Sequence, residues 1–477
     1  MNKLQLFIEN FLIYGLGGMI GKFVPLIMVP IVTRMMPNSE YFGISDLSNT
    51  IISLASALAI LGMYDAMYRL FFEKDDINYK KEICSTTLFF TIILSFIVFL
   101  LMLFFKNQIA YYFLGNTNLV YVVYITAIAT FIGATNGIVS APTRMQNKRV
   151  VFVVMNGITP IISYTIAVIL LYKGYYIIAL PLAGLLTSIF SEIIFWVLNY
   201  KWFRLEFVKF KHLKPLLWIA VPLFPNFLIY WLFNSSSRLM ITNLLGIDAA
   251  GLYAVGSKLG MASQLIYMAF AGGWQYFAFS TMKDKNQVET NSRIFEYLGV
   301  ISFIATAFIC IMAEPIYQLL FTKEYVISFI VAPYLFLAPL LQMLFQVVAN
   351  QFLIIKKTWP NMFILMIGAI FNIIFCYYLI PIYGIEGAAI GTLGGYVVSD
   401  IVCIIVLYKM KLIKLTEKFY MASVLMFMYF IIWRVYLIDN SFIENSIYSI
   451  VFSIILIFLY QNEVRVLFKF LLKNRSK

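Results

Sequence analysis

The sequence predicts an all-α protein that crosses a membrane about fourteen times. Three observations lead to this fold class: 62% of the 477 residues are apolar, only 12% are charged, and the apolar residues fall into long segments joined by short polar connections. A soluble globular protein is typically about 25% charged, so the composition excludes a water-soluble fold. Each long segment approaches the roughly 20 residues that a helix needs to cross the hydrocarbon core.

The spans follow one another along almost the whole chain. The first is too long for a signal-peptide core, and Thr33-Arg34-Met35-Met36-Pro37 after it offers no small-residue cleavage site, so we predict a membrane helix there. The predicted spans are 11–33, 41–63, 83–105, 119–141, 150–171, 175–198, 215–234, 249–271, 294–313, 327–353, 359–379, 384–407, 419–437 and 443–460.

The basic residues predict the orientation of these spans. The chain has 35 Lys and Arg against 22 Asp and Glu, a net charge of +13, and no polar domain in which nucleic-acid-binding charge would gather. With the N-terminus inside, nearly all basic residues fall on cytoplasmic segments, which is the usual bias of membrane proteins. We therefore expect both ends in the cytoplasm and no nucleic-acid partner. The outer loops hold only Arg34, Lys106, Lys173, Arg238, Lys323 and Arg434.

The sequence offers little for enzymatic or metal chemistry. The four cysteines are not closely spaced, and the single histidine is His212. The outer loops are short, and loops of this size mostly connect helices. We therefore expect no enzyme, no disulfide framework and no metal or organic cofactor.

An internal repeat predicts two related halves. Ser191-Glu192-Ile193-Ile194 recurs as Ser399-Asp400-Ile401-Val402, and Lys148-Arg149 recurs at the same offset as Lys356-Lys357. Two six-helix lobes of the same orientation follow, with a symmetry axis along the membrane normal and a substrate path at their interface. The predicted domains are an N-lobe (1–214), a C-lobe (215–414), and two further helices with a basic cytoplasmic tail (415–477).

Five short motifs carry a resemblance to one transporter family. They are Asn10–Gly18 (NFLIYGLGG), Pro30–Pro37 (PIVTRMMP), Glu40–Leu47 (EYFGISDL), Ala249–Val255 (AAGLYAV) and Tyr383–Ala389 (YGIEGAA). In their order and spacing the chain resembles, over its whole length, the polysaccharide-biosynthesis flippases. These are the Wzx-type O-antigen and capsule transporters of the multidrug/oligosaccharidyl-lipid/polysaccharide superfamily.

The resemblance implies a fold and an activity. The fold is a V-shaped transporter of the bacterial cytoplasmic membrane, and we expect a monomer. The activity is movement of an undecaprenyl-pyrophosphate-linked oligosaccharide to the outer leaflet by alternating access, with the polysaccharide polymerase machinery as a further partner. Fourteen helices are similar to lipid-linked oligosaccharide and lipid II flippases, whereas twelve are usual for multidrug exporters of the superfamily.

Basic residues within helices are candidates for the substrate's pyrophosphate. Lys22 and Lys258 fall about 14 to 17 Å into their predicted helices, near the midplane, where a charge usually faces a cavity. Gly15 and Gly18 share a helical face with Lys22 and would leave room for a ligand. The alternative for Lys22 is neutralisation by a buried acid such as Asp46.

Arg34 and Arg238 fall at the outer ends of two equivalent predicted helices. A guanidinium grips phosphate oxygens in a fork, so both are candidates to receive the pyrophosphate, although both could instead extend to lipid headgroups. Asp46 could balance Lys22, bind a coupling cation, or cap nearby backbone.

Two repeat-related acids and two pairs of prolines complete the candidates. Glu192 and Asp400 are candidates for Na⁺ or H⁺ coupling, with structural carboxylates as the alternative reading. The prolines interrupt two symmetry-related helices, where they could act as hinges or as static kinks. They are Pro25, Pro30, Pro222 and Pro225.

Two other transport functions remain open at the level of sequence. A multidrug or organic-cation antiporter of the same superfamily would be expected to have an acid-lined cavity, and a lipid II flippase would share the carrier lipid. A membrane enzyme of the same pathway would be expected to show a large outer loop with paired Arg or an intramembrane His, and this chain has neither.

Overall fold

The computed structural model describes residues 21–260, 262–355, 357, 359–438, 441–463 and 465, and all regular structure in these ranges is helical. The predicted all-α fold class is therefore confirmed. Helical residues 21–35 come first. The α-helices that follow are α2 (Glu40–Ile60), α3 (Met63–Phe71), α4 (Ile77–Phe104), α5 (Lys106–Leu114), α6 (Val120–Met145), α7 (Arg149–Tyr172), α8 (Ala179–Asn199), α9 (Leu213–Ala220), α10 (Phe224–Leu245), α11 (Ile247–Gly260), α12 (Ala262–Ser280), α13 (Gln287–Leu320), α14 (Ala332–Ile354), α15 (Trp359–Tyr383), α16 (Ile385–Lys409), α17 (Glu417–Ile432) and α18 (Phe442–Leu459).

Twelve helical segments among the described residues are long and apolar enough to cross a membrane. Each matches one predicted span, and the chain is therefore a multi-pass membrane protein. The other two predictions, 11–33 and 249–271, include residues outside the described ranges, so the total of fourteen stays a prediction. The orientation of the two termini also stays a prediction.

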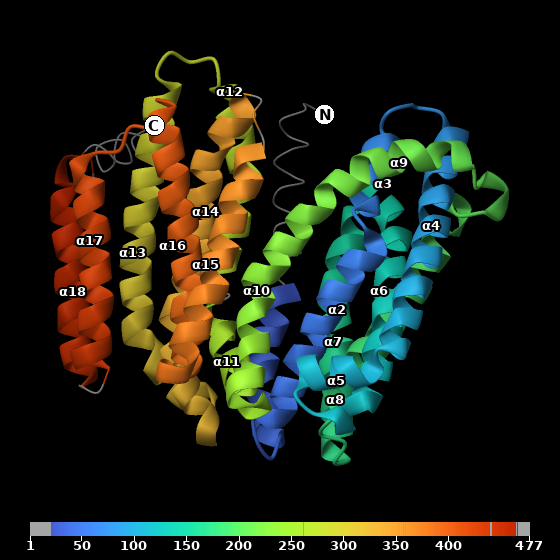
Figure 1. Cartoon of the computed structure of the whole chain (residues 1–477), viewed down its shortest axis with the longest axis horizontal. Coiled ribbons are helices and arrows are strands. Elements are labelled where there is room, and N and C mark those ends of the chain that lie inside the picture. Colours follow the sequence, from blue (N-terminus) through green and yellow to red (C-terminus); the bar gives the residue numbers. More distant parts are fainter. Residues whose placement is uncertain are drawn as a thin grey trace. The chain divides into compact units, whose positions relative to one another are not determined.

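The helix end predicted at residue 234 was wrong. The span predicted at 215–234 is part of a longer rod in which α9 leads through a 3₁₀ turn, Val221–Leu223, into α10 and on to Leu245. Figure 1 shows α9 and α10 as one bent helix. The polar run Asn234-Ser235-Ser236-Ser237-Arg238 looks like a loop, but Ser235, Ser236 and Ser237 are buried inside the helix.

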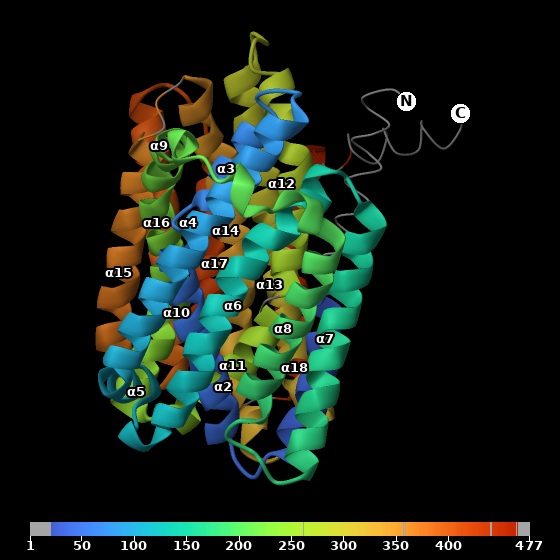
Figure 2. The same cartoon turned by 90° about the vertical axis from the view of Figure 1, so that its right-hand side faces the viewer.

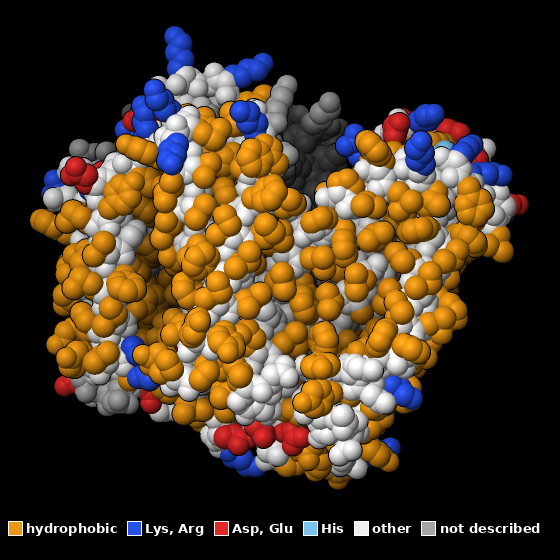
Figure 3. Space-filling model, viewed as in Figure 1, with side chains coloured by type: hydrophobic (Ala, Val, Ile, Leu, Met, Phe, Trp, Pro, Cys, Tyr) orange, Lys and Arg blue, Asp and Glu red, His pale blue; other side chains and the backbone are white. Residues whose placement is uncertain are grey.

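The exterior of the helices is apolar, as a lipid environment requires. On α4 the exposed side chains include Phe96, Leu100 and Phe104, while Ser95 and Thr91 on the same helix are fully buried. Figure 3 shows hydrophobic side chains along the visible lengths of the helices and Lys and Arg gathered at helix ends. The hydrophobic pattern is thus reversed relative to a soluble protein, in which polar groups face outward.

Contacts divide the chain into two compact units. Unit 1 contains the described residues up to Val255 together with Cys376–Ala388, and unit 2 contains the rest. In unit 1, α6 is central and packs against α2, α4 and α8, while α7 packs on α8 (Figures 1 and 2). The predicted lobes at 1–214 and 215–414 stay a prediction.

Unit 2 is organised around α13. This helix packs against α14, α17 and α18, and its buried Glu296 accepts hydrogen bonds from the backbone N–H of Thr416 at 2.6 Å and from its hydroxyl at 2.8 Å. Because Thr416 is the residue before α17, Glu296 fixes the start of that helix. The partly buried Lys418–Glu463 ion pair at 2.9 Å joins the same helix to the end of the described chain.

Candidate functional site

A cavity of about 380 Å³, lined by both polar and apolar side chains, lies within unit 1. We call it the α6–α8 cavity, because α6, α7 and α8 form its walls and the helix of residues 21–35 adds one side. Among the described residues that line it there are two cations and no Asp or Glu. The lining is Gly21, Lys22, Ser140, Thr143, Arg144, Phe152, Met155, Asn156, Thr159, Pro160, Ser191 and Phe195.

Lys22 is exposed on its helix and contributes to this lining. A Cβ at the neighbouring Gly21 would lie 3.3 Å from the backbone oxygen of Asn156, so this helix passes close to α7. Asn156 lies roughly 10 Å from the start of α7. Lys22 thus adjoins the first turns of α7, and its predicted depth near the midplane stays a prediction. Gly15 and Gly18, predicted to share its face, lie outside the described residues.

Arg144 is the second cation of the cavity. It lies in the last turn of α6, where its guanidinium is 5.0 Å from the centre of the Phe152 ring. Its Nη1 donates a hydrogen bond of 3.2 Å to the hydroxyl of Tyr64. A positive charge is also favourable at a helix C-terminus. These contacts hold the guanidinium against α7 with most of its five N–H donors not engaged by the described hydrogen bonds.

Two amide side chains outside the cavity lining orient two hydroxyl groups that belong to it. Asn199 donates from Nδ2 to Thr143 Oγ1 at 2.8 Å and to the carbonyl of Val139 at 2.9 Å. Asn136 donates from Nδ2 to Ser191 Oγ at 3.2 Å. Each of these hydroxyl oxygens thus accepts a hydrogen bond, and the hydroxyl proton remains available for donation to another acceptor.

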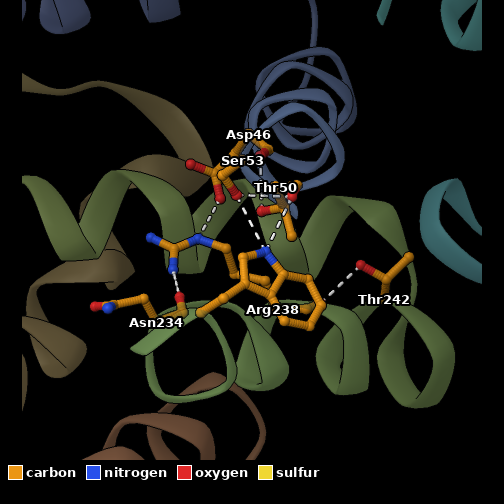
Figure 4. A network of polar contacts seen from close by, with 7 residues as sticks. Asp46, Thr50, Ser53, Asn234, Arg238 and Thr242 are labelled. Carbon is orange, nitrogen blue, oxygen red and sulfur yellow. Dashed lines mark hydrogen bonds and ion pairs between the residues drawn. The ribbon is translucent and has the colours of Figure 1, made fainter. Parts of the chain in front are cut away.

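A buried ion pair forms a second polar feature of unit 1. Asp46 of α2 and Arg238 of α10 approach to 2.5 Å, with side chains only 11% and 12% exposed. Figure 4 shows the Arg238 guanidinium between the Asp46 carboxylate and the backbone of Asn234, whose carbonyl also accepts a hydrogen bond from it. Tyr253 adds its ring at 5.7 Å from the guanidinium.

This pair corrects two sequence predictions. Lys22 was offered as the partner of Asp46, and the structure places Arg238 there instead. Arg238 was also predicted at the outer end of its helix, but because α10 continues to Leu245 it lies inside, at the level of Asp46. Its predicted contact with pyrophosphate, and the role of Asp46 in ion coupling, stay predictions.

Further contacts join α10 and α11 to α2. The Trp231 indole N–H lies 3.2 Å from the carbonyl of Thr50 and 3.1 Å from Ser53 Oγ. A Cβ at Gly43 would overlap the backbone oxygen of Ile247, so the backbone of α2 passes directly against the start of α11. The ion pair is thus one part of a broad, closely packed contact.

The remaining basic candidates are not among the residues that line the α6–α8 cavity. Arg34 is exposed near the end of the helical residues 21–35. Lys258 is half-buried in α11, in unit 2. The predicted close helix contact around it is confirmed, because Cβ atoms at Gly256 and Gly260 would come within 2.7 Å of Ser328 O and Leu335 Cβ. Their contacts with substrate stay predictions.

The two repeat-related acids differ in their surroundings. Glu192 is half-buried in α8 of unit 1, one residue after the cavity-lining Ser191. Asp400 is buried in α16 of unit 2, and its Oδ1 has no hydrogen-bond partner among the described residues. A buried carboxyl oxygen without a donor is costly and calls for a bound proton or ion. Ion coupling through either acid stays a prediction.

The four prolines lie where the helices were predicted to bend. Pro25 and Pro30 lie within helical residues 21–35. Pro222 lies in the 3₁₀ turn between α9 and α10, and Pro225 lies in the first turn of α10. Their positions therefore fit a kink, and the hinge role stays a prediction.

Sequence reasoning missed Arg144 and the hydroxyl-bearing residues of the cavity lining. These are Ser140, Thr143, Thr159 and Ser191. Arg144 lies beyond the predicted span at 119–141, whereas α6 continues to Met145. A signal was present: Asn136, Ser140 and Thr143 recur at helical spacing in an otherwise apolar segment, which indicates one polar face.

Comparison with known proteins places this geometry in context. A family model described as "Polysaccharide biosynthesis protein" matches residues 31–330. No curated protein matches the sequence.

Several solved structures share the fold at low sequence identity. The lipid II flippase MurJ in an inward closed conformation has a TM-score of 0.69 and 16% identity, with 95% of this chain and 99% of that chain covered. An inward-facing MATE-family multidrug resistance transporter of the MOP superfamily has a TM-score of 0.61 and 15% identity over 84% and 94%. A Vibrio cholerae MATE transporter has a TM-score of 0.59 and 14% identity over 85% and 96%. At these identities the likeness concerns the fold alone.

Proposed function

Because the chain belongs to the polysaccharide biosynthesis protein family, we propose that it is a flippase for undecaprenyl-pyrophosphate-linked oligosaccharides. The substrates are repeat units of O-antigen, capsule or a related glycan, carried from the cytoplasmic to the outer leaflet of the bacterial inner membrane. A fold shared with MurJ and MATE transporters, together with twelve apolar helices, supports a transport role.

The observation that carries the proposal is the composition of the α6–α8 cavity. Two cations and several hydroxyls line a cavity among membrane helices, and no carboxylate is among the described lining residues. A cavity lined by charges of one sign attracts ligands of the opposite sign. This lining suits an anionic, sugar-bearing headgroup, whereas an organic cation would be repelled.

The polyprenyl tail need not enter the protein. The exterior of the helices is apolar, so the tail remains among lipid acyl chains while the polar head passes through the protein by alternating access. Lys22, Lys258, Arg34 and Arg238 are the proposed contacts of the head. We propose a monomer that supplies the polysaccharide polymerase machinery and is driven by Na⁺ or H⁺.

Transport of the glycan into a sealed compartment would test this function. Proteoliposomes would carry an undecaprenyl-diphosphate-linked oligosaccharide ending in galactose, and membrane-impermeant galactose oxidase would report the fraction in the outer leaflet. We expect the protein to make the protected inner pool accessible, whereas protein-free liposomes leave it protected. A protected pool that stays constant with active, folded protein would contradict the proposal.

Two other substrates belong in the same assay. Lipid II is the second candidate, because MurJ covers nearly the whole chain and is described as a lipid II flippase. Ethidium represents organic cations. Preferential transport of lipid II over the lipid-linked oligosaccharide would identify lipid II as the substrate. Transport of ethidium alone would establish drug efflux.

A further inference from the structure

The connection from α8 into α9 combines exposed cations with exposed apolar side chains. We call residues 200–220, which form this connection and α9, the α8–α9 surface. We propose that it is a binding site for an anionic phospholipid of the adjoining leaflet, with the headgroup phosphate on lysines and an acyl chain in an apolar groove. This inference does not depend on the proposed transport of a glycan, because it concerns the surrounding lipid rather than the cargo.

Hydrogen bonds to α4 hold the backbone of this surface in place. The Ser85 hydroxyl donates to the carbonyl of Trp202 at 3.1 Å. The backbone N–H of Lys209 donates to Thr86 Oγ1 at 3.0 Å. Between these two points the ring of Phe203 is buried. The exposed side chains of the connection are therefore presented from a fixed backbone, as a binding site requires.

The α8–α9 surface carries an excess of positive charge. Its cations are Lys201, Arg204, Lys209, Lys211 and Lys214, and its acid is Glu206. Arg204 lies 3.1 Å from Glu206, and Lys211 lies 3.1 Å from Glu82 of α4. The exposed Lys209 and Lys214 have no ion-pair partner among the residues that the structure describes. Figure 3 shows Lys and Arg side chains gathered where Figure 1 places α9. A phosphate would supply the missing opposite charge.

An apolar groove of about 430 Å³ opens beside these lysines. Its lining residues are Phe210, Leu213, Lys214, Leu217 and Trp218. α9 already buries another face, with Leu216 and Ala220 fully buried, whereas Trp218 is 81% exposed. Lys214 precedes Trp218 by four residues, so both lie on one side of the helix. Exposed tryptophan is typical of the boundary between lipid and water.

A phospholipid with a negative headgroup matches both parts of this surface. The groove can take part of an acyl chain while the lysines at its edge reach the phosphate. Binding at a membrane interface strengthens with the apolar area buried and with attraction to anionic lipids. A soluble anion would leave the apolar groove in water, and a zwitterionic lipid would leave the lysines without a net opposite charge. The occupant is therefore an anionic phospholipid such as phosphatidylglycerol.

Quenching of Trp218 by brominated lipids would test the site locally. The full-length protein would be reconstituted in phosphatidylcholine vesicles with the same small fraction of brominated phosphatidylglycerol or brominated phosphatidylcholine. In each background, the emission lost in Trp218→Phe reports on this tryptophan alone. The test variant carries Lys209→Gln and Lys214→Gln. The matched control carries Lys409→Gln and Lys411→Gln, which remove two exposed charges at the end of α16 that do not line the groove.

We expect phosphatidylglycerol to be preferred at Trp218 by about tenfold in the wild type, because each basic residue near an anionic lipid contributes a factor of about five in affinity. The test variant should lose most of this preference, and the control should keep it. Equal quenching by the two lipids in the wild type would overturn the site. An equal loss in the control would also overturn it, because the net charge of the protein would then explain the preference. Absence of quenching by either lipid would show that no lipid occupies the groove.

Two single variants separate charge from folding. Lys214→Arg keeps the charge and should keep the preference, whereas Lys214→Gln should lose part of it at an unchanged melting temperature, because the side chain is exposed. Loss of the preference in Lys214→Arg, or its full retention in Lys214→Gln, would overturn the assigned role of this lysine. None of these measurements involves glycan transport, so the lipid site and the proposed function can fail independently.

Discussion

At the scale of single residues, the buried pair of Asp46 and Arg238 is the interaction most sensitive to change. Neither charge can be removed without leaving the other in a poorly solvated place, and such a loss typically costs about 3 to 5 kcal/mol. We therefore predict that Asp46→Asn and Arg238→Gln each lower the melting temperature of the purified protein in detergent by several degrees.

An exposed pair provides the control for this prediction. Arg293 and Glu289 form an i, i+4 pair at 2.6 Å with side chains 62% and 49% exposed. Exposed pairs contribute about 0 to 1 kcal/mol, so Arg293→Gln is expected to leave the melting temperature nearly unchanged. Equal effects of Arg238→Gln and Arg293→Gln would show that the buried pair is not a significant source of stability.

Asp400 supports a prediction about coupling. Its buried Oδ1 has no described hydrogen-bond partner, so an amide of similar shape should be tolerated without loss of stability. If Asp400 carries the coupling proton, Asp400→Asn will abolish the dependence of glycan transport on an imposed pH gradient. The repeat-related Glu192→Gln is the comparison, and an unchanged pH dependence in Asp400→Asn would exclude Asp400 as the proton site.

The candidate site was only partly predictable from the sequence. Lys22 stood out because a charge inside an apolar segment is conspicuous. Arg144 did not, because it is near a predicted helix end and only the folded chain brings it to the same cavity as Lys22. The pairing of Asp46 with Arg238 joins residues far apart in sequence, and no local pattern encodes it.

At the scale of elements, the contact between α2 and α11 depends on glycine. A Cβ at Gly43 would overlap the oxygen of Ile247, and one at Gly251 would overlap the oxygen of Ser39. Both obstacles are backbone atoms, which cannot rotate away as a side chain can. The two helices can therefore approach this closely only with hydrogen atoms at these positions.

We predict that Gly43→Ala and Gly251→Ala each destabilise the protein by about 1 to 3 kcal/mol, the usual cost of overpacking. Gly184→Ala in α8 is the matched control, because nothing lies within 4 Å of its Cβ position. Alanine favours a helix over glycine by up to about 1 kcal/mol, so this control should be neutral or stabilising. Thermal unfolding in detergent would compare the three, and an equal loss in the control would contradict the packing argument.

The helices themselves were largely predictable, because a helix that crosses a bilayer needs a long run of apolar residues. Their ends were less so. The serines between Asn234 and Arg238 have the composition of a loop, yet they continue α10 because the neighbouring helices bury them. That environment is a tertiary property, and a local pattern of polar residues does not contain it.

At the scale of the whole molecule, the orientation of the chain in the membrane can be measured by cysteine labelling, because the four native cysteines are buried. Cys84, Cys310, Cys376 and Cys403 are all buried, so the wild type should react little with a membrane-impermeant maleimide. Single cysteines placed on exposed turns would then report which side each turn faces.

We predict that Glu73→Cys, in the turn between α3 and α4, is labelled only from the cytoplasmic side. Thr117→Cys, in the turn before α6, should be labelled only from the outside. Both positions are exposed, and only the former turn adjoins the basic residues that favour the cytoplasm. Labelling of intact cells and of inverted membrane vesicles would measure this, and the opposite pattern would reverse the predicted orientation.

The pairing of Asp46 with Arg238 also determines how an electrical potential acts on these helices. A single elementary charge moved fully across a membrane gains about 2.3 kcal/mol per 100 mV. Opposite charges only 2.5 Å apart travel together and nearly cancel, so a joint displacement of α2 and α10 transfers almost no net charge. Voltage therefore does little work on that contact, and whatever electrical sensitivity unit 1 has must come from its other charged groups.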